Sequence, residues 1–452
     1  MWELPLGLRL SLLVGLILFT LWSSKRGLHF GILLFLFTTM WRMLEATLFR
    51  AGGGWPNLTL ERIVWPVVLL VFLFQWRKGR IARLPPDSIE YCMGAALVAI
   101  AISLFVFQAH VTGPAGSERL QLYELLAGFA FPFTCYFMMR RVIYSTAQVE
   151  SFLIGVGLIT VYLGVTSLAE GWHLRWLVFP RYILDPNLGD HYGYVRGPFL
   201  NASWNALCMV MGLPVLLWLF FHKRDASRLL WLLGLASIGL SLPFVFQRAA
   251  WLGAGAAVII TIVAWRRRRS LLIATVLLIA AVGGLLIPQP LEERIKSKWA
   301  NPANIIFRLK IAEVTSQIIS DHLATGVGFT QYNQALRRYG LDPGYTSHNT
   351  FLSLFVELGI FGFAPYLLIF IALLAKSIKM YWQLPWCRML IGGMFGITAA
   401  YLIMSMAVEL RIVLYPNVLF FTLWAMCLEV IRRQATLRQA RDIVHQKVVS
   451  FV

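Results

Sequence analysis

Long apolar runs, separated by short charged or turn-rich segments, make up most of the chain. Many runs reach the roughly 20 residues that an α-helix needs to cross a bilayer. This pattern predicts an all-α polytopic membrane protein with about 12–13 transmembrane helices. We place the spans near 4–22, 28–49, 62–76, 90–109, 121–139, 151–169, 204–222, 229–246, 249–265, 270–287, 349–375, 389–408 and 415–430.

Two connecting segments, 170–203 and 288–347, are much longer than the others. Loops of this length in a compact protein are usually functional or disordered. The sequence shows no internal repeat and no low-complexity linker, so we expect residues 1–452 to form one integral membrane domain. Both long segments are expected on the same, outward-facing side of the membrane.

The segment 288–347 is predicted to be a folded helical loop. Pro302 suits a first helical turn, and Gly326 and Gly328 are expected to end the helix that follows. A shorter helix near 331–339 should stop at Gly340. Apolar residues recur near helical spacing in the first helix, at Ile305, Leu309, Ala312 and Ile319.

Composition and charge agree with a membrane protein. Hydrophobic residues make up 59% of the chain and charged residues 13%, about half the charge of an average soluble domain. The net charge of +19 would also suit a nucleic-acid partner, but 23 of the 40 Lys and Arg fall in seven segments that we expect to be cytoplasmic. This is the positive-inside distribution, so we expect membrane lipids around the chain and no nucleic acid. The seven segments are 23–27, 77–83, 140–150, 223–228, 266–269, 376–388 and 431–452.

The sequence does not point to a metal or a cofactor. The five cysteines show neither a CxxC pair nor metal-ligand spacing, and four lie in or beside apolar spans, as small buried hydrophobic residues do. The stretch "DPNLGDHY" offers Asp185, Asn187, Asp190 and His191 as oxygen or nitrogen ligands, but without an EF-hand-like spacing. We therefore expect no metal and no cofactor.

Several arginines on the outward-facing side run against the positive-inside bias. Arg248 opens the apolar span "RAAWLGAGAAV", and Arg196 precedes the Gly197-Pro198 turn at the start of a helix. Arginine suits phosphate, because its planar fork donates two parallel hydrogen bonds and stays protonated. We take Arg196 and Arg248 as candidates for an anionic ligand. Snorkelling and surface ion pairs are the alternative explanation.

The segment 170–203 interleaves aromatic residues with arginines. Aromatic rings at the headgroup level usually form an interfacial belt, which is the interpretation that we favour. The alternative is an apolar platform under a sugar ring. The aromatic residues are Trp172, Trp176, Phe179, Tyr182, Tyr192 and Tyr194.

His348 stands at the mouth of the apolar span that begins at 349. Ser347 or Asn349 can cap this helix, so capping alone does not require the imidazole. An imidazole titrates near neutral pH, so it can take the proton from an alcohol that displaces a diphosphate. Arginines on the same face would stabilise the charge on the leaving group. Glu357 lies nine residues further, on the opposite helix face and about 13.5 Å deeper, so we expect it to pair with a basic group instead.

At these residues the chain resembles the O-antigen ligase and O-antigen polymerase superfamily. "SHNTFLSLFVELGIFGF" is similar to its His-Asn…Glu-Leu-Gly…Gly signature, and "FRLKIAEVTSQIISDHLATGVGFTQY" resembles the helix before it, with its Gly-Val-Gly ending. "FQRAAWLGAGAAV" and "RGPFLNASWNAL" are similar to the segments that carry two Arg residues in the family. Two positions depart: Gln247 stands where Ser is usual, and "NASWNA" replaces the usual Pro-Asn pair.

The resemblance implies an inverting, metal-independent glycosyltransferase of the GT-C class in the bacterial inner membrane, active on the periplasmic face. The donor would be a glycan on undecaprenyl diphosphate. His348 would be the catalytic base, and Arg196, Arg248 and Arg308 would bind the diphosphate. Asn349 and Asn205 would support the site.

Three functions remain open from the sequence. A ligase would transfer the glycan to lipid A-core or a related acceptor, and the single folded outer loop favours this assignment slightly. A polymerase would transfer it to a second undecaprenyl-linked glycan, with a chain-length regulator as a candidate partner. A transporter or flippase for lipid-linked anions is the more remote alternative, because transporters usually show inverted repeats and charges at mid-membrane.

Overall fold

The computed structural model describes residues 6–41, 59–107, 122–143, 145–189, 191–265, 293, 303–341 and 348–449. In these residues the fold is all-α with no strand, and eight helices are long and apolar enough to cross a membrane. The predicted fold class, an all-α polytopic membrane protein, is confirmed. The expected span at 270–287 and the second half of the span at 28–49 lie outside the described residues.

The membrane helices follow the apolar runs closely, because most runs end at Gly, Pro or a charged residue. Four further helices accompany these eight, namely α1, α2, α4 and α11, of which α2 and α11 are shorter apolar helices. The bounds are α1 Leu6–Arg26, α2 Leu28–Thr38, α4 Leu60–Arg77, α5 Ser88–Phe107, α7 Phe131–Val142, α8 Thr146–Gly171, α9 Ala202–His222, α10 Ser227–Ser241, α11 Arg248–Ala264, α16 Thr350–Gln383, α17 Arg388–Ser405 and α18 Leu414–Val449.

Short tight turns connect or extend several of these helices. A π-helical turn, η2 (Leu126–Ala130), precedes α7, and insertions of this kind are frequent at functional sites. The 3₁₀ turns are η3 (Arg181–Leu184), η4 (Gly197–Phe199), η5 (Leu242–Val245) and η7 (Pro385–Cys387).

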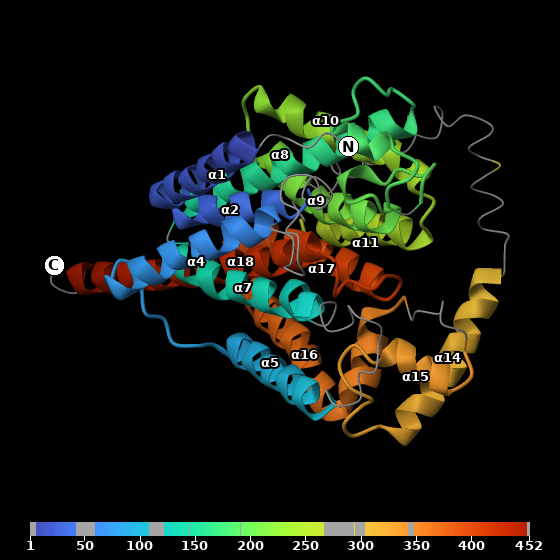
Figure 1. Ribbon diagram of the computed structural model, residues 1–452. Coiled ribbons are helices and arrows are strands. Elements are labelled where there is room, and N and C mark those ends of the chain that lie inside the picture. Colours follow the sequence, from blue (N-terminus) through green and yellow to red (C-terminus); the bar gives the residue numbers. More distant parts are fainter. Residues whose placement is uncertain are drawn as a thin grey trace.

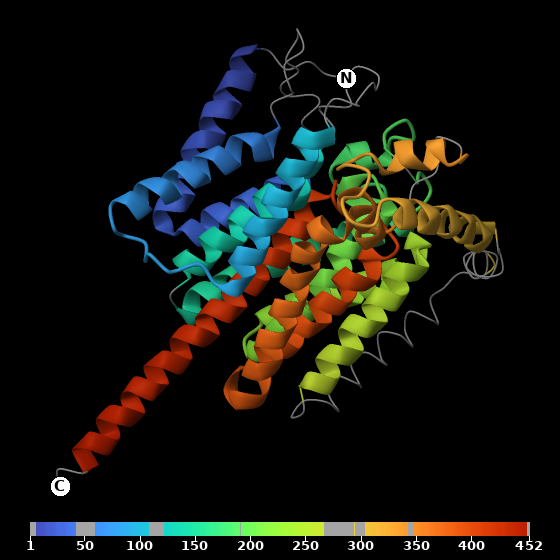
Figure 2. The same cartoon turned by 90° about the horizontal axis from the view of Figure 1, so that it is seen from below.

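Helix α18 forms the centre of the bundle (Figure 1). Its apolar stretch is fully buried, between α7, α17 and α9. The expected span at 415–430 is correct, but the helix continues to Val449 through the basic tail (Figure 2). Neither Gly nor Pro interrupts this tail, and Glu429 pairs with Arg432 and Arg433 one turn later, which favours continued helix.

The second long segment contains the two expected helices, α14 (Ala303–Asp321) and α15 (Tyr332–Arg338), which lie beside the outer half of α16 (Figure 1). Pro302 itself lies outside the described residues. Helix α14 ends five residues before Gly326, and α15 ends two residues before Gly340.

The predicted apolar face of α14 is partly wrong. Leu309 is 64% exposed, whereas Ile311 and Ile318 are buried against α15 and α16. Thr315, between them, shares a hydrogen bond of 2.6 Å with the hydroxyl of Tyr332. The spacing 311, 315, 318 is also helical, and the polar Thr315 concealed this face in the sequence.

Candidate functional site

The proposed site residues gather at one end of the bundle, which we call the site end. Here α9, α11, α16 and α18 begin and α8 and α17 end. Gly253, in the second turn of α11, packs near Met404 at the end of α17. The following loop binds α16, since Thr350 Oγ1 donates to Val408 O (2.9 Å) and accepts from Leu410 N (2.8 Å).

His348 is exposed and has a left-handed backbone conformation, with φ 48°. Asn349 is the N-cap of α16, and its Oδ1 accepts the amide of Leu352 at 3.1 Å. The expected capping role of Asn349 is confirmed. Because Thr350 is bound to the 408–410 loop, the backbone next to His348 is fixed both by the cap of α16 and by the loop between α17 and α18.

Glu357 pairs with a basic group, as its depth in α16 predicts, and the partner is Arg411. Two further carboxylates approach the same guanidinium: Glu409 Oε1 lies 2.8 Å from Nε, and Glu124 Oε2 lies 3.5 Å from Nη1. Burial disfavours the charge of Arg411, but the carboxylates outweigh this effect and raise its pKa well above the usual range. Three carboxylates around one arginine form a buried acidic cluster.

Helix α16 is interrupted at Gly359, where φ is 61° and ψ −173°. The segment after α14 fills the break with backbone hydrogen bonds. Val327 N donates to Val356 O (3.0 Å), and Gly328 N donates to Glu357 O (2.9 Å). The Gly-Val-Gly and Glu-Leu-Gly elements of the sequence therefore meet backbone to backbone, and this contact fixes the outer helices on α16.

Arg196 is fully buried, and its guanidinium binds loop carbonyls. Nε and Nη2 donate to Ile183 O at 3.2 and 2.8 Å. Nη1 donates to Leu188 O and Nη2 to Asp185 O, both at 2.5 Å. Its carbon Cζ lies 5.0 Å from the centre of the Tyr192 ring. With its N–H groups committed to the backbone, Arg196 shapes this loop in the structure and does not present an open fork to a diphosphate.

Asn205 lies beneath the turn that follows Arg196. Its Nδ2 donates to Ser167 Oγ at 2.8 Å. A Cβ at Gly197, where φ is +52°, would lie 2.5 Å from Asn205 Cγ, so only glycine fits there. Glu170 Oε2 accepts the amides of Arg196 (3.1 Å) and Gly197 (2.9 Å). Asn205 therefore contacts the turn at Gly197, and its expected supporting role in the site stays a prediction.

Arg248 is the first residue of α11 and is half-buried at the site end. Its position agrees with an anion-binding role, since helix N-termini attract negative charge. Arg308 lies on α14, and its side chain is outside the described residues. The structure therefore brings Arg248 and His348 to the same end of the bundle, where Arg196 and Asn205 are fully buried.

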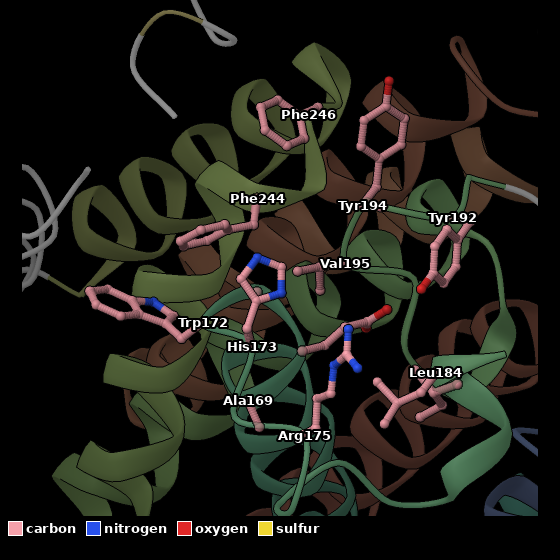
Figure 3. Close-up of a pocket in the computed structure, with 14 residues that line it drawn as sticks. Ala169, Trp172, His173, Arg175, Leu184, Tyr192, Tyr194, Val195, Phe244 and Phe246 are labelled. Carbon is pink, nitrogen blue, oxygen red and sulfur yellow. The ribbon is translucent and has the colours of Figure 1, made fainter. Parts of the chain in front are cut away.

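A pocket of about 450 Å³ opens at the site end between the first long segment and the turn before α11 (Figure 3). We call it the aromatic pocket. Glu170, His173 and Arg175 supply its charged and polar groups. Its aromatic walls are Trp172, Tyr192, Tyr194, Phe244 and Phe246.

Five of the six aromatic residues named in segment 170–203 divide into two groups, whereas the Tyr182 hydroxyl donates to Pro198 O at 2.9 Å. Trp176 and Phe179 are 72% and 62% exposed and are not part of the pocket lining, as expected of an interfacial belt. Trp172, Tyr192 and Tyr194 face the pocket. The sequence could not separate the groups, because Phe244 and Phe246 come from a distant turn. In the sequence, only the position of Phe246 two residues before Arg248 hints at the pocket.

Among the described residues, no three His, Cys, Asp or Glu side chains come together in a group that could hold a metal ion. Asp185 of the "DPNLGDHY" stretch accepts the amide of Asn187 at 2.9 Å. Asp190 of that stretch lies outside the described residues.

In a comparison with protein families, residues 233–367 match the family model described as O-antigen ligase. The matched segment begins in α10 and ends in α16, so it contains Arg248, Arg308, His348 and Glu357. Arg196 and Asn205 precede it. No curated protein sequence matches the chain at a significant level.

Proposed function

The segment 233–367 confirms the resemblance to the O-antigen ligase and polymerase superfamily, and on that basis we propose that the chain is a lipid-linked glycan transferase. It transfers a glycan from undecaprenyl diphosphate to an acceptor hydroxyl, with inversion at the anomeric carbon. One observation carries the proposal. The two residues with the required chemistry, Arg248 and His348, lie within the family match and at the same end of the bundle.

In the proposed reaction, the acceptor oxygen forms a bond to the anomeric carbon of the donor glycan. The bond from that carbon to the diphosphate oxygen breaks, and the acceptor proton passes to the imidazole of His348. The diphosphate leaves as an anion and needs no acid to protonate it. Arg248 binds this anion and stabilises the charge that develops on it. No metal or cofactor takes part in this scheme.

Arg196 has a different role in this proposal from the one that its sequence suggests. Its guanidinium already binds the carbonyls of Ile183, Asp185 and Leu188. We assign it to positioning the loop beside the donor site and assign direct diphosphate binding to Arg248. Arg308 remains a candidate for a second diphosphate contact, because it lies on α14 within the family match.

We propose that the protein resides in a bacterial inner membrane with the site end on the periplasmic side. The opposite end supports this orientation, because Lys223 and Arg224 lie there in the connection between α9 and α10, and Arg228 lies in the first turn of α10. Basic connections favour the cytoplasm. The partners would then be the lipid-linked donor, the acceptor and membrane lipids.

The acceptor separates two forms of this function. A ligase transfers the glycan to lipid A-core or a related acceptor, and the single folded outer unit of α14 and α15 favours this form. A polymerase transfers it to another undecaprenyl-linked repeat unit, with a chain-length regulator as a possible partner.

The test is incubation of the purified protein with undecaprenyl-diphosphate-linked repeat unit, first alone and then with lipid A-core. A mobility shift of lipid A-core, without a ladder in its absence, supports the ligase. A ladder from the repeat unit alone supports the polymerase. If neither product forms but the lipid-linked glycan crosses the bilayer of a proteoliposome, the chain is a transporter and the proposal is wrong.

A further inference from the structure

We propose that the aromatic pocket binds a saccharide residue of the donor glycan, close to its diphosphate. This inference rests on the proposed function and assigns a substrate contact to a surface outside the proposed catalytic residues. It concerns the pocket lined by Trp172, Tyr192 and Phe244, with His173 and Arg175 as its polar groups.

The lining of the pocket has the chemistry of a sugar site. Figure 3 shows Tyr192 on one side and Trp172 and Phe244 on the other, with the Arg175 guanidinium and the His173 imidazole between them. A pyranose presents C–H groups on its faces and hydroxyls at its edges, so it needs apolar walls with a few polar groups. The volume of the aromatic pocket, about 450 Å³, lies within the range of roughly 300–1,000 Å³ that small-molecule sites occupy.

Trp172 also offers an unused hydrogen-bond donor. Its indole Nε1 is buried and has no hydrogen-bond partner among the residues that the structure describes. A buried donor without a partner costs roughly 1–3 kcal/mol of desolvation. A hydroxyl oxygen of a bound sugar would satisfy this donor.

The pocket is held in shape by polar contacts beneath it. Arg196 ties the loop carbonyls together and lies under the ring of Tyr192. Glu170 accepts the amides of Arg196 and Gly197, and Val195 N donates to Phe244 O at 3.1 Å. The two halves of the pocket, distant in sequence, are thus joined by backbone hydrogen bonds. Such a prearranged site avoids an ordering cost on binding.

We assign the pocket to the donor and not to the acceptor because the pocket lies close to Arg248. Phe246 lines the pocket and lies two residues before Arg248, so at most about 7 Å of chain separates their Cα atoms. If Arg248 binds the diphosphate, the sugars linked to that diphosphate are the ones that reach the pocket. The acceptor approaches the anomeric carbon from the opposite side in an inverting displacement.

The first test measures binding without turnover. The probe is the free repeat-unit oligosaccharide, released from the donor by mild acid, and the readout is saturation-transfer NMR with the purified full-length protein. We expect saturation transfer to the sugar with the wild-type protein and its loss in Tyr192→Ala and Phe244→Ala. Trp172→Phe keeps the ring and removes the Nε1 donor, so it should weaken binding by a smaller factor. Trp176→Ala, an exposed aromatic of the same segment outside the pocket, is the matched control and should bind as the wild type does.

The second test separates the pocket from the catalytic proposal. In the transfer assay, Tyr192→Ala should raise KM for the donor by roughly five- to tenfold and leave KM for the acceptor unchanged. Unchanged donor KM and unchanged oligosaccharide binding in the pocket variants overturn the saccharide site. A rise confined to the acceptor KM overturns its assignment to the donor. Full activity of His348→Ala, in contrast, refutes the proposed function.

Discussion

Gly326 and Gly359 lie backbone against backbone, and each has a backbone conformation that residues with a side chain rarely adopt. A Cβ on Gly359 would lie 2.6 Å from the amide nitrogen of Gly326, and a Cβ on Gly326 would lie 2.5 Å from the amide nitrogen of Gly359. Both φ angles are positive, 71° and 61°. This contact joins the segment after α14 to the interrupted helix α16, and the proposed base His348 directly precedes the N-cap of that helix.

Gly359→Ala should therefore destabilise the protein by about 3 kcal/mol or more, because strained φ and a clash with backbone add together. Gly326→Ala should have a similar effect. Thermal unfolding in detergent measures both. Gly94→Ala is the control, since a Cβ there meets nothing within 4 Å. Equal stability of Gly359→Ala and Gly94→Ala would contradict the packing described for this contact.

The acidic cluster makes an asymmetric prediction. Arg411→Met removes the only described cation beside the carboxylates of Glu124, Glu357 and Glu409, and loss of one partner of a buried ion pair costs about 3–5 kcal/mol. Glu124→Gln removes one of the three acidic groups around a single cation and should be neutral or stabilising. The free energy of unfolding of the two variants is measured from denaturation curves. A larger loss of stability in Glu124→Gln than in Arg411→Met would contradict this assignment of charges.

Asp87, at the opposite end of the bundle, should give stability that depends on pH. Burial raises the pKa of Asp87, but three contacts outweigh this effect and lower the pKa below its usual value. The contacts are with the amide of Glu90 (3.0 Å), Lys376 (3.0 Å) and Arg140 (3.7 Å). A carboxyl group whose pKa is lowered by folding stabilises the fold at pH values above its unfolded-state pKa of about 3.9. This contribution is lost as the pH falls through the pKa of the folded state.

The measurement is the difference in melting temperature between the wild type and Asp87→Asn across pH 3–7. This difference should be constant above about pH 5 and should shrink below about pH 4. A difference that grows on acidification would show that the carboxyl is not stabilised as an anion.

Arg248→Lys tests whether the planar fork matters for the donor. Lysine keeps the charge but cannot donate two parallel hydrogen bonds to a phosphate group. Because a charged hydrogen bond contributes about 1.5–3 kcal/mol, kcat/KM for the donor should fall by roughly 10- to 100-fold. Arg224→Lys, exposed at the opposite end, is the matched control. Equal activity of both variants would remove Arg248 from the diphosphate site.

The sequence predicted the fold class and most helix ends, because apolar runs and their Gly, Pro and charged boundaries are local signals. It also predicted the cap at Asn349 and a basic partner for Glu357. It did not predict that partner as Arg411, which lies 54 residues away, because ion pairs across helices leave no local pattern.

Arg196 shows the limit of chemical inference from residue type. An arginine before a Gly-Pro turn suits an anion, but its donors are taken by carbonyls of residues 183–188, which only the folded loop brings near. The aromatic pocket escaped prediction for the same reason, because its walls come from two segments about fifty residues apart.

The most direct test of the account compares His348→Ala with His322→Ala in single-turnover glycan transfer, with donor binding measured separately. His322 is exposed on the same outer segment and serves as the matched control. We predict that His348→Ala binds donor and unfolds as the wild type does but transfers glycan at least about 100-fold more slowly, since general-base catalysis contributes roughly 10²–10⁴-fold. Wild-type transfer by His348→Ala would contradict the assignment of His348 as the base.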